Sequence, residues 1–200
     1  PDVNALGCSL VAPEDHAGFL HELHLCVDAA HQVNCDRLEV LTGNAITGLS
    51  RSVQMDNCVT ALERAVPVLE ANGMVAVVEL LNSNVDHPGY FLNRVEEGVE
   101  MISRVGSPNV KLLFDIYHVQ VMQGNIIEHI RDSFSYVGQY HFADVPGRHE
   151  PGTGEINFRN VFRAIYDLQY TGFITAEYHP TDSTFRDLEN VKALATFSEE

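Results

Sequence analysis

The chain has 200 residues, of which 45% are hydrophobic and 20% charged, as in an ordinary globular protein rather than a disordered one. Its formal net charge of −16 at pH 7 argues against a nucleic-acid or anionic-membrane partner, because both are bound by neutralising phosphates with Lys and Arg. No apolar stretch approaches the roughly 20 residues that span a bilayer and no signal-like segment opens the chain, so we expect a cytoplasmic protein.

Apolar periodicity along the chain alternates between helical and extended segments. The opening decade, PDVNALGCSL, is typical of a loop. Helical spacing predicts helices at 16–34, 53–72, 91–105, 125–135 and 157–169. Short runs rich in Val, Leu, Ile and Phe predict strands at 37–41, 74–81, 109–118, 136–145 and 172–179.

Strands that alternate with helices and are apolar on both faces indicate a parallel α/β sheet, either doubly wound or closed into a (β/α)8 barrel. A doubly wound nucleotide-binding sheet would carry a Gly-rich phosphate loop, and the sequence has no such motif. We therefore predict a single TIM-barrel domain over residues 1–200. A complete barrel needs eight strands in about 250 residues. Because the chain also begins with Pro1 rather than Met, we expect an N-terminally truncated barrel that lacks the first βα units and retains about five of the eight strands.

Four ionisable side chains lie near the ends of four separate predicted strands: Glu79, Asp115, His141 and Glu177. Parallel strands of one barrel end at the same mouth, so we expect these side chains to converge. Three carboxylates at one point would repel one another unless a cation lies among them. Taken singly, Glu79 could instead pair with a basic residue, Asp115 could cap a helix, and His141 could be a core histidine. Convergence favours a divalent metal site, with Mg²⁺ or Mn²⁺ expected and Co²⁺ left open by the imidazole.

Four segments, VELLN, NVKLLFDIYHVQVMQGN, HFADVPGRHEPGTGEINF and GFITAEYHP, resemble hydroxypyruvate isomerase and its relatives in the xylose-isomerase-like (β/α)8 barrel superfamily. The resemblance covers essentially the whole chain, from the loop after the third barrel strand onward. It implies that Glu79, Asp115, His141 and Glu177 ligate the metal, and that the two glutamates transfer protons. It also implies that His118 and Arg148 contact substrate oxygens. Relatives assemble as dimers or tetramers, so a homo-oligomer is a further expectation.

Moving a carbonyl group between adjacent carbons requires removing a proton from one carbon and returning one to its neighbour, through an enediolate whose charge must be stabilised. A divalent cation and two glutamates suit this reaction. We therefore expect a metal-dependent isomerase acting on a small hydroxy-carbonyl acid, and specifically the conversion of hydroxypyruvate to tartronate semialdehyde.

Two departures from the family pattern keep other substrates open. Leu80 stands where many relatives have Pro, and His141 stands where some hydroxypyruvate isomerases have Gln and sugar epimerases have His. A ketose 3-epimerase, or another sugar or sugar-phosphate isomerase, is therefore the alternative. Asp86 would then be the extra carboxylate that holds the sugar, although capping of its own loop is the simpler interpretation.

Two further hypotheses concern other classes of protein. A metal-dependent abasic-site endonuclease of the same superfamily would need more histidine ligands and a basic surface, which the charge of −16 opposes. A barrel that only binds a sugar acid would not need two proton-transfer groups, so Glu79 and Glu177 weigh against that hypothesis.

Overall fold

A six-stranded, wholly parallel sheet forms the centre of the protein, whose computed structural model describes residues 2–3 and 8–197. The strands follow one another in chain order across the sheet, so each connection returns the chain to the same end of the next strand. They are β1 (Asp2–Val3), β2 (Arg37–Val40), β3 (Val75–Glu79), β4 (Val110–Asp115), β5 (Val137–Phe142) and β6 (Ile174–Ala176).

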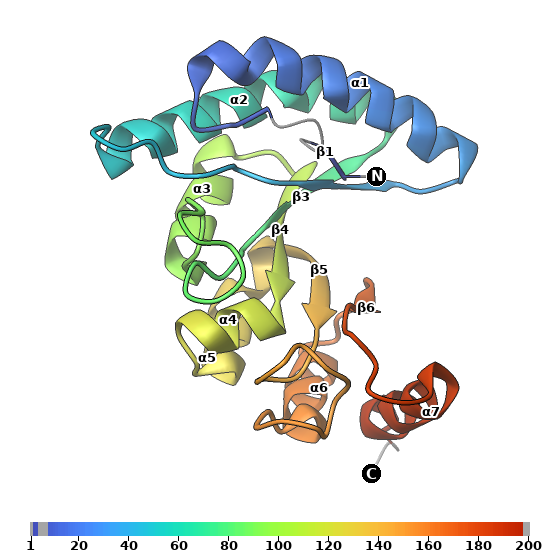
Figure 1. Cartoon of the computed structure of the whole chain (residues 1–200). Helices are drawn as coiled ribbons and strands as arrows, with labels where there is room; N and C mark the ends of the chain where they lie inside the picture. Colours follow the sequence, from blue (N-terminus) through green and yellow to red (C-terminus); the bar gives the residue numbers. More distant parts are fainter. Residues whose placement is uncertain (1, 4–7, 198–200) are drawn as a thin grey trace.

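Helices lie around the outside of the curved sheet, as Figure 1 shows. The longest, α2, is capped at its start by Ser50, whose side chain accepts a hydrogen bond from the amide of Val53, and is followed by Gly73 in the left-handed conformation. The helices are α1 (His16–Gln32), α2 (Arg51–Asn72), α3 (Val95–Val105), α4 (Ile116–Met122), α5 (Ile126–Ser133), α6 (Phe158–Asp167) and α7 (Thr184–Ala195), with 3-10 turns η1 (Pro13–Asp15) and η2 (Phe134–Tyr136).

Alternation along the strands divides the sheet into two faces. Every second residue, such as Val78 in β3, Phe114 in β4 and Tyr140 in β5, is fully buried in the hydrophobic core. The intervening residues face the concave side, and Glu79, Asp115 and His141 belong to this set. Pairing of Asp115 with His141, and of Glu79 with Leu113, places these side chains at one end of the sheet.

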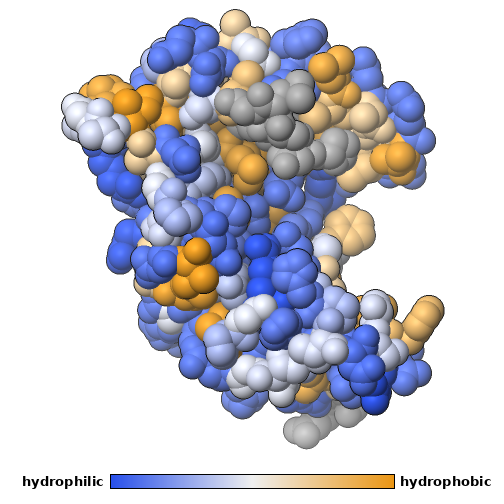
Figure 2. Space-filling model, in the orientation of Figure 1, coloured by the Kyte–Doolittle hydropathy of each residue, from blue (hydrophilic) through white to orange (hydrophobic). Residues whose placement is uncertain are grey.

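The curved sheet is open between β1 and β6, which do not pair with each other among the described residues. The open side lies between the N-terminus and β6 in Figure 1, and the molecular surface is hollowed there in Figure 2. All three residues of β6 are solvent-exposed, whereas β3 and β4 are almost entirely buried. The architecture is thus a half-barrel whose last strand is covered on neither face.

The predicted alternation of helices and parallel strands is confirmed, with three differences. Asp2–Val3 forms a short strand against β2, where the sequence predicted only a loop. The strand predicted at 109–118 ends at Asp115, because the carboxylate of Asp115 caps a helix that begins at Ile116. Helix α7 was not predicted; it packs against α6 near the end of the chain.

In the part of the chain that is described, no helix combines the length and the apolar character needed to cross a bilayer.

Candidate active site

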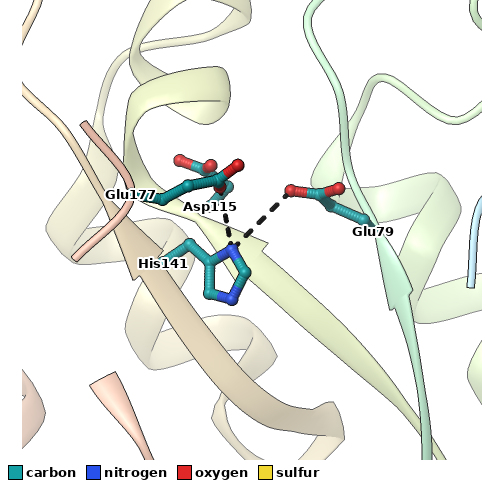
Figure 3. A group of neighbouring side chains, drawn as sticks. All are labelled: Glu79, Asp115, His141 and Glu177. Carbon is teal, nitrogen blue, oxygen red and sulfur yellow. Dashed lines mark hydrogen bonds and ion pairs between the residues drawn. The ribbon is translucent and has the colours of Figure 1, made fainter. Parts of the chain in front are cut away.

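Four side chains from four strand ends meet on the concave side of the sheet: Glu79, Asp115, His141 and Glu177. Each offers one nitrogen or oxygen atom, and these atoms all lie within 4.8 Å of one another. Figure 3 shows the three carboxylates pointing toward one another around the His141 ring. The structure therefore brings together every residue that the sequence placed at a common site.

Asp115 is fixed by the start of helix α4. Its Oδ1 accepts hydrogen bonds from the amides of Tyr117, at 2.7 Å, and His118, at 3.3 Å. Its Oδ2 is buried and has no hydrogen-bond partner among the described residues. Burial, followed by the charge of Glu177, raises the pKa of Asp115 to about 6. Asp115 can therefore cap helix α4 through Oδ1 and take part in the site through Oδ2.

Glu79 ends strand β3 with its side chain 5% exposed. Burial raises the pKa of Glu79 well above the ordinary value, and the nearby carboxylates of Glu39, Asp115 and Glu177 add to the effect. Glu39 faces the same concave side from the neighbouring strand β2. No Lys or Arg pairs with Glu79 in the described part of the chain, so the simple ion-pair explanation for a carboxylate in this strand does not hold.

Glu177 follows strand β6, and its amide donates to the carbonyl oxygen of Phe142, which extends the pairing of β5 and β6. Its side chain is 47% exposed, and Oε2 lies 3.0 Å from His141 Nδ1. Although partial burial acts in the opposite direction, the hydrogen bond to His141 and the charge of Arg148 lower the pKa of Glu177. Burial would lower the pKa of His141, but the hydrogen bond to Glu177 and the nearby carboxylates raise it.

Arg148 reaches the same cluster from the loop after β5. Its Nη2 lies 2.9 Å from Glu177 Oε1 and 3.9 Å from Asp115 Oδ2, and the guanidinium stacks 5.3 Å from the centre of the Tyr117 ring. The Arg148 backbone is in the left-handed region, with φ 56°. The guanidinium is therefore held over the carboxylates rather than left as a solvated loop charge.

Two buried carboxylates, those of Asp144 and Glu150, hold the loop that carries Arg148 in place by hydrogen bonds. Asp144 accepts hydrogen bonds from four backbone amides, those of Val145, Gly152, Gly154 and Ile156. Glu150 accepts from both the amide and the hydroxyl of Thr181, which lies just beyond Glu177. These bonds link the loop to the segment after β6, so Arg148 and Glu177 are positioned together.

His118 lies on helix α4 with its ring buried. Its Nδ1 is contacted by the amide nitrogen of Asn82 at 3.2 Å and by Asn82 Nδ2 at 2.7 Å. Burial lowers the pKa of His118 to about 3, so the ring is neutral at physiological pH. With Nδ1 accepting from Asn82, the ring proton resides on Nε2, which lies 3.7 Å from Asp115 Oδ2 and has no hydrogen-bond partner among the described residues.

The donor set fits a divalent cation. Three carboxylates and one imidazole are hard or borderline ligands of the kind that such ions prefer. The partnerless Oδ2 of Asp115 and the raised pKa of Glu79 are both accounted for if a cation lies among the four side chains. Gln139, whose amide group lies 2.7 Å from His141 Nε2, would hold the imidazole with Nδ1 turned toward the carboxylates.

Several residues of this site were not predicted. Asn82 holds both His118 and Asp86, and the Tyr117 hydroxyl donates to Asp86 Oδ2 at 2.8 Å. Asp86 thus joins two elements of the site rather than capping its own loop. Asp144 could have been found from its position directly after a strand, and Gln139 from its spacing of two residues before His141. Asn82 ends the segment VELLN that resembles the family, but its contact with His118 depends on a helix that the sequence did not predict.

Comparisons with known proteins identify the family of the fold. Residues 4–196 match the model of the xylose isomerase-like TIM barrel family. A putative hydroxypyruvate isomerase from Danio rerio is 37% identical over 92% of this chain and 68% of its own length. A 2-oxo-tetronate isomerase from Cupriavidus necator is 32% identical, over 86% of this chain and 66% of its own.

Solved structures share the fold. A Brucella melitensis protein described as a family 2 AP endonuclease has a TM-score of 0.82 and 29% identity, covering 89% of this chain and 68% of its own. A D-psicose 3-epimerase from Clostridium cellulolyticum has a TM-score of 0.80 at 20% identity, covering 94% and 74%, and supports the fold alone. The family match over nearly the whole chain and the similarity to hydroxypyruvate isomerases lead to one conclusion: this chain belongs to the xylose isomerase-like TIM barrel family.

Proposed function

We propose that this chain is a metal-dependent isomerase of a small hydroxy-keto acid, with the conversion of hydroxypyruvate to tartronate semialdehyde as the reaction to test first. The observation that carries the proposal is the convergence of two glutamates, an aspartate and a histidine within 4.8 Å at the ends of parallel strands. Relatives named hydroxypyruvate isomerase and 2-oxo-tetronate isomerase support the class of substrate.

A divalent ion would be held by Glu79, Asp115, His141 and Glu177. Mg²⁺ and Mn²⁺ suit three carboxylates, and the imidazole of His141 also admits Co²⁺. Such an ion supplies Lewis-acid stabilisation of the negative charge that develops on the two substrate oxygens. The remaining steps depend on the side chains of the chain itself.

The two glutamates differ in a way that suits acid and base roles. Glu177 has a lowered pKa and is held ionised beside Arg148 and His141, so it would remove the proton from the carbon that bears the hydroxyl group. Glu79 lies opposite Glu177 across the cluster in Figure 3, so it would return a proton to the neighbouring carbon. One carbon loses a proton and its neighbour gains one, while the hydroxyl proton passes to the former carbonyl oxygen.

His118 and Arg148 would hold the substrate between them. A neutral His118 with its proton on Nε2 is a hydrogen-bond donor, directed to a point near Asp115 where a substrate oxygen would lie. The guanidinium of Arg148 is the positive charge nearest the carboxylates and would attract the acid group of the substrate.

The test is turnover of hydroxypyruvate by the metal-free protein, by the protein with Mn²⁺ or Mg²⁺, and by its Glu177→Gln variant. Metal-dependent turnover that disappears in the variant would support the proposal. If the folded protein binds metal but does not convert hydroxypyruvate, 2-oxo-tetronate and then ketoses should be tried, which also tests the epimerase alternative. If the protein binds no divalent metal at all, the proposed site is wrong.

The endonuclease hypothesis has little support from the site. Only one of the four clustered side chains is a histidine. The net charge of −16 would repel a DNA backbone. A test for cleavage of abasic-site DNA, run beside the isomerase assay, is expected to show no activity.

A further inference from the structure

We propose that Tyr117 is the positioning residue that holds Arg148 in reach of the acid group of the substrate, and that the preference of the site for an acid over a neutral analogue depends on the Tyr117 ring. The inference rests on the proposed function, in which Arg148 attracts that acid group, and adds a residue to it. No role was predicted for Tyr117 from the sequence. The cap of helix α4 does not need its side chain, because only its backbone amide bonds to Asp115.

The ring of Tyr117 is held at both ends. The residue is 3% exposed and lies in the first turn of α4. Its amide donates to Asp115 Oδ1 at 2.7 Å, and its hydroxyl group donates to Asp86 Oδ2 at 2.8 Å. The ring also packs edge to face with the His118 ring, at 5.2 Å between centroids and an interplanar angle of 66°. These contacts leave the ring little freedom to move.

Asp86, which receives the Tyr117 hydroxyl group, is itself anchored. Asn82 Nδ2 donates to Asp86 Oδ2 at 2.6 Å, and the amide of Asp86 donates to Asn82 Oδ1 at 3.0 Å. Although burial acts in the opposite direction, the hydrogen bonds from Asn82 and Tyr117 lower the pKa of Asp86. The hydroxyl group of Tyr117 therefore bonds to a fixed and ionised acceptor, which makes a stronger hydrogen bond than a neutral one.

The face of the Tyr117 ring supports the guanidinium of Arg148. Arg148 Cζ lies over the ring, 5.3 Å from its centre. A cation in this position is attracted by the electrons of the ring. Glu177 and Asp115 attract one nitrogen of the guanidinium, Nη2, at 2.9 and 3.9 Å. The carboxylates thus fix where this nitrogen lies, whereas the ring limits the tilt of the guanidinium plane.

Arg148 can still contact a ligand in this position. Its side chain is 19% exposed, in contrast to 1% for Asp115. Both ion pairs use Nη2, and a guanidinium carries five N–H donors in a planar fork. A carboxylate pairs best with two donors of this fork, which requires a fixed plane. A neutral amide group lacks the charge for this pair and gains little from a fixed plane.

A role in positioning Arg148 differs from a role in packing by its effect on ligands. A side chain that only filled space would, when removed, weaken the binding of acid and neutral ligands alike. A side chain that acts through the charge of Arg148 should affect the acid alone. The contrast between an acid and its amide is therefore the measurement that separates the two roles.

The experiment compares pyruvate with pyruvamide, which share one carbon skeleton and cannot isomerise, because the carbon beside the carbonyl group bears no hydroxyl group. Ligand-detected NMR titrations with Mg²⁺ present are expected to show tighter binding of pyruvate by the unchanged protein. Tyr117→Leu should weaken pyruvate binding about threefold to tenfold, as expected for the loss of a cation–π contact at a partly exposed site, and leave pyruvamide binding unchanged. Tyr117→Phe keeps the ring and should keep the preference for pyruvate.

Tyr166→Leu is the matched control, because it removes an exposed tyrosine ring that lies 5.9 Å from the guanidinium carbon of Arg163 on α6. In an Arg148→Met background, Tyr117→Leu should have no further effect on pyruvate binding, since its effect passes through Arg148. If Tyr117→Leu does not fold, Tyr117→Met takes its place, because methionine fills irregular space without an aromatic ring.

Three results would overturn the inference: a folded Tyr117→Leu variant that keeps the preference for pyruvate, a Tyr117→Phe variant that loses as much of it, or equal binding of the two ligands by the unchanged protein. Failure of the proposed function looks different. Pyruvate is then preferred and the preference falls in Tyr117→Leu, but neither hydroxypyruvate nor 2-oxo-tetronate is converted.

Discussion

The two glutamates of the candidate site lie in contrasting parts of the half-barrel. Glu79 ends a strand in the closed part of the sheet, with its side chain 5% exposed and packing on both sides. Glu177 follows the exposed edge strand β6, with its side chain 47% exposed. The same residue type therefore has a raised pKa in one region and a lowered pKa in the other. Burial and charged neighbours, rather than the residue type, therefore set the direction of each pKa shift.

The largest expected effect is on catalysis, and it should be similar for both glutamates. If the proposed roles hold, Glu79→Gln and Glu177→Gln are each expected to lower kcat for the isomerisation by about 10²- to 10⁴-fold, because each removes one proposed proton-transfer group. Steady-state assays with saturating Mn²⁺ test this. The exposed Glu63→Gln on α2 is the matched control.

The same two variants should differ in stability. Without metal, Glu79→Gln should raise the free energy of unfolding by on the order of 1 kcal/mol, or a few degrees in Tm, because it removes a carboxylate from an unfavourable buried position. Glu177→Gln removes a half-exposed group with favourable partners and should be neutral or slightly destabilising. Equal changes of Tm in the two variants would contradict the expected difference between buried Glu79 and half-exposed Glu177.

The loop that carries Arg148 is held by four backbone hydrogen bonds to the side chain of Asp144. Asp144→Asn replaces one acceptor oxygen with a donor group, which leaves about two backbone amides of the Arg148 loop without a partner and should cost about 1–3 kcal/mol. We expect faster hydrogen exchange at Gly152 and Gly154 and a lower kcat. Exchange rates equal to those of the exposed control Asp132→Asn would show that the loop does not depend on Asp144.

Two substitutions of Asp115 should separate its role as a helix cap from its proposed role as a metal ligand. Asp115→Asn keeps an oxygen for the amides of Tyr117 and His118 but loses the charge, so Mn²⁺ affinity should fall about tenfold or more, while the fold is retained. Asp115→Ala also loses the cap and should be about 1 kcal/mol less stable than the Asn variant. Titration calorimetry and thermal unfolding measure the two effects. Unchanged Mn²⁺ affinity in Asp115→Asn would exclude Asp115 as a ligand.

The smallest effect concerns pH. The pKa of Asp115 is raised to about 6, and those of Glu79 and His141 are also raised, so protonation of these groups favours the folded state as the pH falls. Burial lowers the pKa of His118 to about 3 and also lowers that of His87, so these two rings favour the unfolded chain over the same interval. The two effects oppose each other, and without metal Tm should change little as the pH falls from about 7.5 to about 5.5. Mn²⁺ affinity should fall over the same interval, because a metal ion competes with protons for these ligands.

Much of the fold and the convergence of the site could be predicted because both depend on periodic patterns. Alternating helical and extended segments predict a parallel sheet, and the carboxyl ends of parallel strands share one edge. Glu79, Asp115, His141 and Glu177 are therefore brought together by strand order alone. Helix α4 was missed because Ile116, Tyr117 and His118 continue an apolar run, and only the carboxylate of Asp115 ends the strand.

The sequence by itself determined the residue types of the site, their places at strand ends and the half-barrel they belong to. Only the tertiary structure decided their protonation and their partners. It buried Glu79 among carboxylates, divided the two oxygens of Asp115 between a helix and the site, and left the buried Nε2 of His118 without a hydrogen-bond partner among the described residues. The reason is physical: strand position follows from local periodicity, whereas a pKa or a partnerless atom depends on every chain segment that packs around it.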